Sequence, residues 1–374
     1  MYRSSRCWVT RGTKNQEVGS VERMSLMNNK IAKIAGSPKC PKLTTLFLQG
    51  MYLKRISGGI FTCMPRLVVL DLSENSRLTL LPEEISELVS LKYLDLSRTW
   101  IWELPVCVQK LKKLIHLYLE GISNLRRIDG ISQLSSLRTL KLLGCEQLRF
   151  DKSWKELRLL KHLEVLTTEI LSKLDLEKLL FCHMGRRCIQ KVVIKDMTEE
   201  SFGIVRNCKG PCFRNLSSVA IERCRQLKDS TWLLFAPNLV HLSLKNIWEL
   251  EEVVSIEKAD EMEVQDLIPF GKLETLVMVD LPVVKSIYWT PLPFPCMREM
   301  TIDRCPKLEK LPLSSESVAE VERFVITCEA ADWIEGVEWE DEATRLRFLP
   351  FTQNCISLFL SPFLLSFPNI LFPN

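Results

Sequence analysis

The sequence of 374 residues has little of what enzyme active sites are usually built from. It contains 14 glycines, and the segment between Gly12 and Gly19 lacks the lysine–hydroxyl pair of a phosphate-binding loop. The G-x-S-x-G and H-E-x-x-H motifs and the motif set of protein kinases are also missing. The four histidines are scattered along the chain, at His116, His162, His183 and His241. We interpret them as solvated surface residues, and the sequence predicts a chain that is not an enzyme.

The 14 cysteines do not form a recognisable metal site. The densest group is Cys182, His183, Cys188, Cys208 and Cys212, and its spacing fits no familiar zinc pattern, so no metal ligand or other cofactor is predicted. The first ten residues are basic but lack the apolar region of a secretory signal. Free thiols in a chain without a signal are typical of a reducing compartment, which favours a cytoplasmic location.

Charge of one sign is not in excess. The chain carries 50 Lys and Arg against 46 Asp and Glu, a net charge of +4, which is too balanced for binding nucleic acid by neutralising phosphates. The charges are unevenly placed, because residues 1–42 hold nine basic and two acidic residues whereas residues 316–342 hold ten acidic residues and Arg323. The two ends of the chain are therefore expected to present fields of opposite sign.

Leucine, by contrast, is abundant, with 60 copies. The leucines follow the pattern Leu-x-x-Leu-x-Leu, most clearly in the segments that begin at Leu67 and Leu91. Twelve copies begin at residues 21, 43, 67, 91, 114, 137, 163, 189, 216, 239, 273 and 297. Their mean spacing of about 25 residues lies within the range of leucine-rich repeats. A chance match would not recur so often in register, so the chain is predicted to be a repeat array.

The spacing within each copy predicts the local structure. The central Leu-x-Leu residues are two apart, so both side chains point to the same face of a short strand. Parallel stacking of such strands buries these faces in one core, which predicts an α/β leucine-rich-repeat solenoid, a horseshoe with a parallel sheet on its concave side. Segments such as Leu81-Pro82-Glu-Glu-Ile85 are expected to form turns or short helices on the convex side. Asn75 is expected to hydrogen-bond backbone groups of the turn.

The same patterns divide the chain into three parts. Residues 1–20 are a basic amino-terminal segment, residues 21–350 hold about twelve repeats, and residues 351–374 are an apolar tail. The repeats become irregular after residue 150, where residues 171–184 have helical spacing. We expect an acidic loop at residues 249–266 and an acidic cap at residues 316–342. The tail contains two interior prolines and is at the short limit for crossing a bilayer, so we expect a disordered extension rather than a membrane anchor.

Several segments resemble a specific group of repeat proteins. They include Leu43-Thr-Thr-Leu-Phe-Leu-Gln49, Cys305-Pro-Lys-Leu-Glu-Lys-Leu-Pro312 and Trp333-Ile-Glu-Gly-Val-Glu-Trp-Glu-Asp341, with further matches at residues 23–29, 80–97 and 285–295. From about Val21 to Pro350 the chain resembles the leucine-rich-repeat region of plant intracellular nucleotide-binding leucine-rich-repeat disease-resistance proteins of the coiled-coil class. The resemblance implies a receptor module of innate immunity, whose partner is a pathogen effector or a host protein that an effector modifies.

The chain departs from the resembled family because it shows no coiled-coil or nucleotide-binding module. Binding of ADP or ATP is therefore not carried over to any residue here, and would come only through such a module in another chain. The sequence is compatible with a truncated gene, a fragmentary gene model or a short independent protein. Two alternative functions remain open: a generic scaffold or decoy, and a substrate receptor of a ubiquitin ligase. The second would need an F-box-like helical segment before the repeats, and about 20 residues cannot hold one.

The residues between the core leucines are the candidate binding residues, because they point outward from the concave face of the sheet. The candidates are Phe47, Asp71, Lys92, Tyr93, Asp95, His116, Tyr118, Arg138, Lys141, His241 and Lys245. Phe47, Tyr93 and Tyr118 are expected at neighbouring repeats. Exposed aromatic residues on a rigid sheet are typical anchors for a protein partner. The alternative is that they stack on one another as cross-strand neighbours.

The basic start of the array suggests a second contact. Lys30, Lys33, Lys39 and Lys42 form a possible docking edge for the acidic surface of a nucleotide-binding module. The alternative is a solvated, frayed cap.

Overall fold

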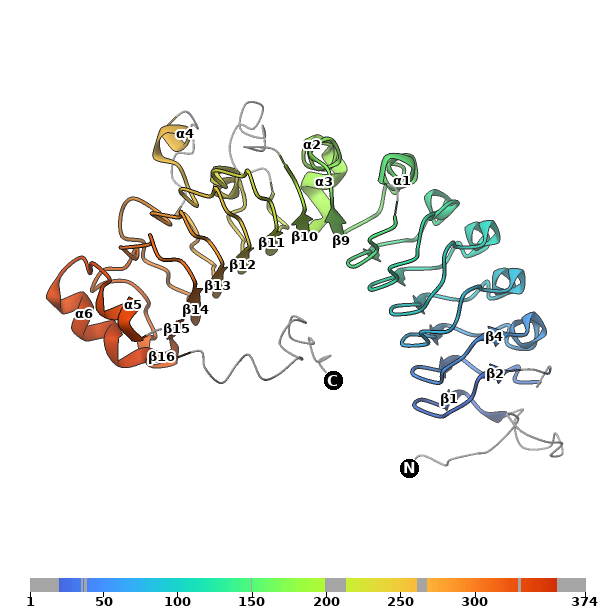
Figure 1. Cartoon of the computed structure of the whole chain (residues 1–374). Helices are drawn as coiled ribbons and strands as arrows, with labels where there is room; N and C mark the ends of the chain where they lie inside the picture. The colour runs from blue at the N-terminus through green and yellow to red at the C-terminus, as the bar shows by residue number, and fades with distance from the viewer. Residues whose placement is uncertain are drawn as a thin grey trace. The chain divides into compact units, whose positions relative to one another are not determined.

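The computed structural model describes residues 20–34, 36, 39–148, 150–198, 213–260, 268–328 and 331–354 (Figure 1). The chain divides into two compact units. The first contains the residues up to Ile170 together with Cys182–Val192, and the second contains Leu171–Phe181 and the residues from Val193 onward.

The first unit is built on short parallel strands that pair in chain order. They are β1 (Arg23–Ser25), β3 (Thr45–Phe47), β5 (Val69–Asp71), β6 (Tyr93–Asp95), β7 (His116–Tyr118), β8 (Thr139–Lys141) and β9 (Val165–Ile170). The next strand, β10 (Ile189–Lys195), begins in the first unit and ends in the second.

The second unit continues with strands of the same kind, again parallel and in chain order. They are β11 (Ser218–Glu222), β12 (His241–Lys245), β13 (Thr275–Val279), β14 (Glu299–Asp303), β15 (Val325–Cys328) and β16 (Thr352–Asn354). Every one of the twelve predicted repeats contains one of the strands up to β14. The predicted fold class, a leucine-rich-repeat solenoid with a parallel sheet, is confirmed.

Two strands of the main sheet were not predicted. β15 and β16 lack the Leu-x-Leu pair, since their sequences are Val-Ile-Thr-Cys and Thr-Gln-Asn. β15 lies inside the acidic segment 316–342, so that segment contains a further strand of the array. β16 lies inside the predicted tail, and residues 355–374 lie outside the described residues.

The leucines of the pattern form the core of each unit. Leu70, Leu72, Leu94 and Leu96 are fully buried, while the residues between and beside them are partly exposed. Burial of one such side chain stabilises the folded state by roughly 1.5–3 kcal/mol relative to leaving it exposed, and the contribution recurs in every repeat. The alternation fixes the register, because a shift by one residue would turn all of these leucines toward solvent.

The chain returns from each strand through short 3-10 helices in the regular part of the first unit. They are η2 (Gly58–Cys63), η3 (Glu83–Glu87), η4 (Val106–Lys110) and η5 (Ile131–Gln133). Pro82 and Pro105 precede η3 and η4, as predicted from the proline positions. A small parallel pair, β2 (Lys33–Ile34) with β4 (Arg55–Ile56), lies between the main strands and these helices in the chain.

The less regular repeats carry α-helices in place of some turns. They are α1 (Phe150–Leu157), α2 (Lys173–Phe181), α3 (His183–Cys188), α4 (Ile256–Asp260), α5 (Ala331–Glu335) and α6 (Glu342–Phe348), with η7 (Thr231–Phe235), η8 (Val321–Arg323) and η9 (Leu349–Phe351). The predicted helix at residues 171–184 is observed as α2, followed by the start of α3. None of the helices in the described ranges is long and apolar enough to cross a membrane.

The expected loop at residues 249–266 is only partly a loop. Leu250, Val253 and Val254 are buried in the core, and α4 follows them. The acidic side chains hid this pattern, because three apolar residues at irregular spacing do not resemble the repeat. Residues 261–267 lie outside the described residues.

Asn75 links two neighbouring repeats. Its Oδ1 accepts hydrogen bonds from the backbone N–H groups of Met51 and Leu53, both at 3.0 Å, and its Nδ2 donates to the carbonyl oxygens of Leu48 and Leu72 at 2.9 and 2.8 Å. The side chain is fully buried. Asn75 thus provides hydrogen-bond partners for backbone groups that the strand pairing leaves unpaired, as predicted from the sequence for this position.

Candidate protein-interaction surface

The exposed face of the sheet is formed by the side chains that alternate with the buried leucines. Strand pairing aligns them in two rows across the first unit. One row is Phe47, Asp71, Asp95, Tyr118 and Lys141, and the other contains Val69, Tyr93, His116 and Thr139. Seven of the predicted residues, Phe47, Asp71, Tyr93, Asp95, His116, Tyr118 and Lys141, are therefore brought together on one surface, whereas Lys92 and Arg138 precede β6 and β8 and belong to neither row.

An aromatic cluster lies on β6 and β7. The ring centroids of Tyr93 and Tyr118 are 5.1 Å apart in an edge-on arrangement, and those of Tyr93 and His116 are 6.1 Å apart. The rings stack as cross-strand neighbours, and they also remain partly exposed. Their role as anchors for a protein partner stays a prediction. Phe47 does not belong to this cluster, because β5 lies between β3 and β6 and places Asp71 beside it.

A lysine already lies against this cluster. The Nζ atom of Lys141 is 4.3 Å from the centroid of the Tyr118 ring, and 3.9 Å from Oε2 of Glu120. The Tyr118 ring is thus shown to accept a cation through its face.

Two carboxylates stand next to the cluster. Asp71 and Asp95 are register partners, and the Oδ1 atom of each accepts a hydrogen bond of 2.8 Å from the backbone N–H two residues later, at Ser73 and Ser97. The Tyr93 hydroxyl donates to Oδ2 of Asp95 at 3.2 Å. Neither carboxylate forms an ion pair with a residue in the described part of the chain.

Burial perturbs the groups of this patch. The pKa of the Asp95 carboxyl is raised by burial and also by the neighbouring charge of Asp71, while the bonds from Ser97 oppose the shift. The pKa of Tyr93 is raised by burial and by Asp95, so its hydroxyl stays protonated and remains a donor. Burial, with a smaller effect of Arg138, lowers the pKa of His116.

His116 is half-buried rather than fully solvated as predicted. Its Nδ1 atom is buried and has no hydrogen-bond partner among the described residues. His162 is exposed, in agreement with the prediction. Near the cluster, Arg138 pairs with Glu164 at 2.9 Å, and Lys92 is exposed.

The remaining predicted residues lie in the second unit. His241 and Lys245 are at the two ends of β12, where they are register partners of Ser218 and Glu222. The structure therefore divides the predicted site residues into a larger group in the first unit and this pair in the second.

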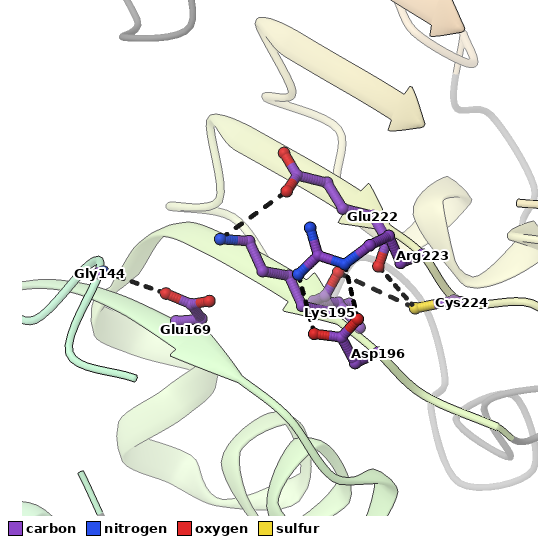
Figure 2. A network of polar contacts seen from close by, with 8 residues as sticks. Gly144, Glu169, Lys195, Asp196, Glu222, Arg223 and Cys224 are labelled. Atoms are coloured by element: carbon purple, nitrogen blue, oxygen red, sulfur yellow. Dashed lines mark hydrogen bonds and ion pairs between the residues drawn. The ribbon is translucent and has the colours of Figure 1, made fainter. Parts of the chain in front are cut away.

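Charged side chains of consecutive repeats also pair with each other (Figure 2). In the second unit, the Nζ atom of Lys195 lies 3.7 Å from Oε2 of Glu222. The Arg223 guanidinium donates two hydrogen bonds of 2.7 and 2.9 Å to the carboxylate of Asp196. The Arg223 guanidinium holds the pKa of Asp196 below its usual value. The pairs were missed from the sequence, because their members are 27 residues apart and meet only after the repeats are stacked.

The predicted docking edge is exposed. The side chains of Lys30, Lys33, Lys39 and Lys42 are all exposed to solvent. In the backbone register of β2 and β4, Lys33 lies opposite Arg55. Sequence reasoning missed the exposed Trp100 and Trp102, which lie at alternate positions around the buried Ile101. The spacing Trp-Ile-Trp after a Leu-x-Leu strand is the signal that could have revealed them.

No group of metal-ligating side chains occurs within the described ranges. Cys208 and Cys212, two members of the cysteine group considered from the sequence, lie outside those ranges.

Repeated parallel strands, buried leucines and a linking asparagine define a leucine-rich-repeat protein. The leucine-rich repeat region family matches residues 22–353, and the chain belongs to this family.

The chain is also similar to plant disease resistance proteins. It is 49% identical to a probable disease resistance protein of Arabidopsis thaliana. The alignment of 379 residues covers 92% of this chain and 42% of that protein. It is 48% identical to Disease resistance protein RFL1 and 45% identical to Disease resistance protein RPS5 of the same plant, in each case over 92% of this chain and 43% of the relative. The chain thus spans less than half the length of these relatives.

A solved structure agrees on the fold. A crystallised internalin from Listeria monocytogenes matches with a TM-score of 0.57, covering 85% of this chain and 89% of the internalin. The sequence identity is 15%, so this likeness concerns the fold alone.

Proposed function

We propose that the chain is a non-catalytic protein-recognition module of plant innate immunity. The observation that carries this proposal is the sequence identity of 45–49% to disease resistance proteins over 92% of the chain. The proposed partner is a pathogen effector or a host protein that an effector modifies. Nucleotide binding is assigned to no residue of this chain, and a nucleotide-binding module in another chain is a further proposed partner of the lysine edge.

The cytoplasm is the proposed location. The ten cysteines recorded in the described residues all carry free thiols, which fits a reducing compartment. Burial raises the pKa of Cys145 to about 12 and that of Cys305 to about 12, so these two thiols are packing residues rather than nucleophiles.

The proposed recognition surface is the aromatic cluster of Tyr93, His116 and Tyr118 with the adjacent Asp71 and Asp95. Tyrosine offers a large contact area at a low cost in conformational entropy, so the rings suit a protein anchor. The two carboxylates lack a cation, which suits a basic side chain of the partner. Lys141 over the Tyr118 ring illustrates the same attraction within the chain.

A binding experiment tests the proposal. Proteins that co-purify with the full chain from pathogen-inoculated leaf tissue are identified, purified and titrated against the chain in vitro. We expect the double variant Tyr93→Ala, Tyr118→Ala to bind such a partner at least tenfold more weakly, because about 1–3 kcal/mol is typical of an anchor of this kind. The double variant Asp71→Asn, Asp95→Asn should also bind more weakly, and more so at low salt.

Matched controls remove the same groups elsewhere. Tyr288→Ala removes a tyrosine that stacks on Trp289, and Glu83→Gln with Glu87→Gln removes two exposed carboxylates of η3. These controls should leave affinity unchanged. Equal losses in test and control variants would show that the exposed face of the sheet is not the recognition surface.

A further inference from the structure

A second surface of the first unit exposes two tryptophans. Trp100 and Trp102 follow β6 and keep 51% and 43% of their surface accessible, whereas Ile101 between them is fully buried. Together with Thr79, Asn124 and Arg126 they line a hollow of about 350 Å³. A monomeric protein seldom exposes two such side chains next to a hollow without a function.

The repeat register holds these residues in place. Trp100 donates its backbone N–H to the carbonyl of Leu78 at 2.9 Å, and Arg126 donates its backbone N–H to the carbonyl of Trp102 at 2.9 Å. Residues 79, 102 and 126 are therefore equivalent positions of three consecutive repeats, each two residues before a buried core residue: Leu81, Leu104 and Ile128. The hollow is a product of the stacked backbone and is formed before any partner binds.

The surroundings of the hollow are basic. The segments that follow β1, β3, β5 and β7 carry the exposed cations Lys30, Lys33, Lys54, Arg55, Arg77 and Arg126. None of the six forms an ion pair with a residue that the structure describes. Among the residues beside these cations, Arg127 forms an ion pair with Asp129, and Glu103 contributes a negative charge. We call this surface, from Lys30 to Arg126, the tryptophan flank.

We propose that the tryptophan flank docks an acidic polypeptide segment of a partner, which inserts an aromatic or aliphatic side chain into the hollow. Tryptophan and arginine are the residues that most often dominate the energy of protein interfaces. Arginine binds carboxylates with two parallel hydrogen bonds, and the neighbouring cations draw an acidic chain toward the site. The flank consists of residues that follow the strands and precede the 3-10 helices, so it is separate from the exposed face of the sheet.

A polypeptide fits this surface better than a nucleic acid. The chain carries a net charge of only +4, which gives little of the general attraction that nucleic acids need. Thr79 and Asn124 add a hydroxyl and an amide at the hollow. These groups can pair with the N–H and C=O groups of an extended peptide.

Peptide selection tests the proposal. A phage-displayed library of random 12-residue peptides is selected on the full chain, and the enriched peptides are synthesised and titrated. We expect enriched sequences to be rich in Asp and Glu around one aromatic or large aliphatic residue. Their Kd should rise at least tenfold for the double variant Trp100→Ala, Trp102→Ala. The single variant Trp248→Ala removes an equally exposed tryptophan of the second unit and should leave the Kd unchanged.

The charges are tested in the same way. Arg77→Glu with Arg126→Glu should raise the Kd at least tenfold, and raising the salt concentration should weaken binding to the unmodified chain. Lys113→Glu changes an exposed cation outside the flank and should have little effect. Circular dichroism of each variant confirms that it remains folded.

Four results would overturn the proposal. Enriched peptides without acidic residues would exclude an acidic polypeptide, and a Kd that the tryptophan substitutions leave unchanged would exclude the hollow as its binding site. Displacement of the peptides by a 12-nucleotide oligothymidylate at micromolar concentration would assign the flank to single-stranded nucleic acid. Concentration-dependent self-association that the tryptophan substitutions abolish would assign it to a second copy of this chain.

Discussion

At the scale of the single residue, buried polar groups decide how well the repeats fit together. The Oδ1 atom of Asn75 accepts hydrogen bonds and its Nδ2 atom donates them, and the two backbone N–H groups bound by Oδ1 belong to the preceding repeat. Asn29 holds the same position in the first repeat but is exposed, and its Nδ2 bonds the Leu26 carbonyl at 2.8 Å. Water can replace the amide at Asn29, whereas it cannot reach Asn75.

We therefore expect Asn75→Ala to lower the free energy of unfolding by about 3 kcal/mol, because several buried backbone groups lose their partners. Asn29→Ala is the matched control and should cost less than about 1 kcal/mol. Urea titrations followed by circular dichroism measure both values. Equal costs would show that the asparagine acts through local turn geometry rather than through burial.

Glycine is required at the turn after β8. Gly144 has a φ of +72°, and a Cβ atom there would lie 3.2 Å from the backbone Cα of Gly121. We expect Gly144→Ala to destabilise the protein by about 1–2 kcal/mol, the usual cost of the left-handed conformation, with a further cost from this contact.

Gly121→Ala provides the comparison for that prediction. Gly121 has a φ of +69°, but its Cβ would meet the flexible side chain of Arg98 at 3.2 Å. The cost should therefore be smaller than for Gly144→Ala. The two thermal unfolding midpoints give the order, and the reverse order would contradict the role of the backbone contact.

At the scale of the element, α6 contributes a large ring to the core of the second unit. Phe348 at the end of α6 is fully buried, and its ring centroid lies 5.6 Å from that of Phe324. Asp341 begins the helix, where its Oδ1 accepts a 2.7 Å hydrogen bond from the backbone N–H of Thr344. This cap stabilises the first turn of α6.

Phe348→Ala should destabilise the terminal repeats by about 3–5 kcal/mol, because a large ring is lost from a packed site. Leu346→Ala changes an exposed residue of the same helix and should have almost no effect. Hydrogen exchange resolved by segment should show faster exchange in β15 and β16 for Phe348→Ala, with β5 to β7 unchanged. Uniformly faster exchange would mean that the array unfolds as one unit.

The elements also show what the sequence could and could not predict. Most strands of the main sheet up to β14 were found because their segments carry a pair of large aliphatic residues, usually leucine, two residues apart, which a strand must bury on one face. β15 and β16 were missed because Val-Ile-Thr-Cys and Thr-Gln-Asn lack that pair and are held by the neighbouring strand. The candidate site followed the same rule. Tyr93 and Tyr118 were placed correctly on one face, but the hollow at Trp100 depends on three stacked repeats.

At the scale of the whole molecule, the proposed recognition surface should respond to pH. Burial raises the pKa of Asp95, so its carboxylate gains a proton at a higher pH than an ordinary aspartate as the solution is acidified. Binding of a basic partner should therefore weaken as the pH falls through that raised pKa. In Asp95→Asn this part of the pH dependence should be absent, and binding should already be weaker at neutral pH.

The same shift gives the sign of the effect on stability. A carboxyl whose pKa is raised in the folded state destabilises the fold when charged. This penalty is full above the folded pKa, shrinks as the pH falls below it, and is gone only below the pKa of the unfolded chain. Asp95→Asn removes the charge and keeps an acceptor for Ser97, so the free energy of unfolding at neutral pH should stay equal or increase. A clear loss of stability would show that the charge of Asp95 supports the fold rather than binding.

Hydroxyl-radical footprinting of the chain with and without a purified partner tests the central proposal most directly, because it reports which side chains the partner covers. We predict that Tyr93, His116 and Tyr118 become protected from oxidation when the partner binds, while Trp248 keeps the same rate. Unchanged oxidation of these three rings, with protection at η3 and η4 instead, would contradict the proposal that the exposed face of the sheet is the recognition surface.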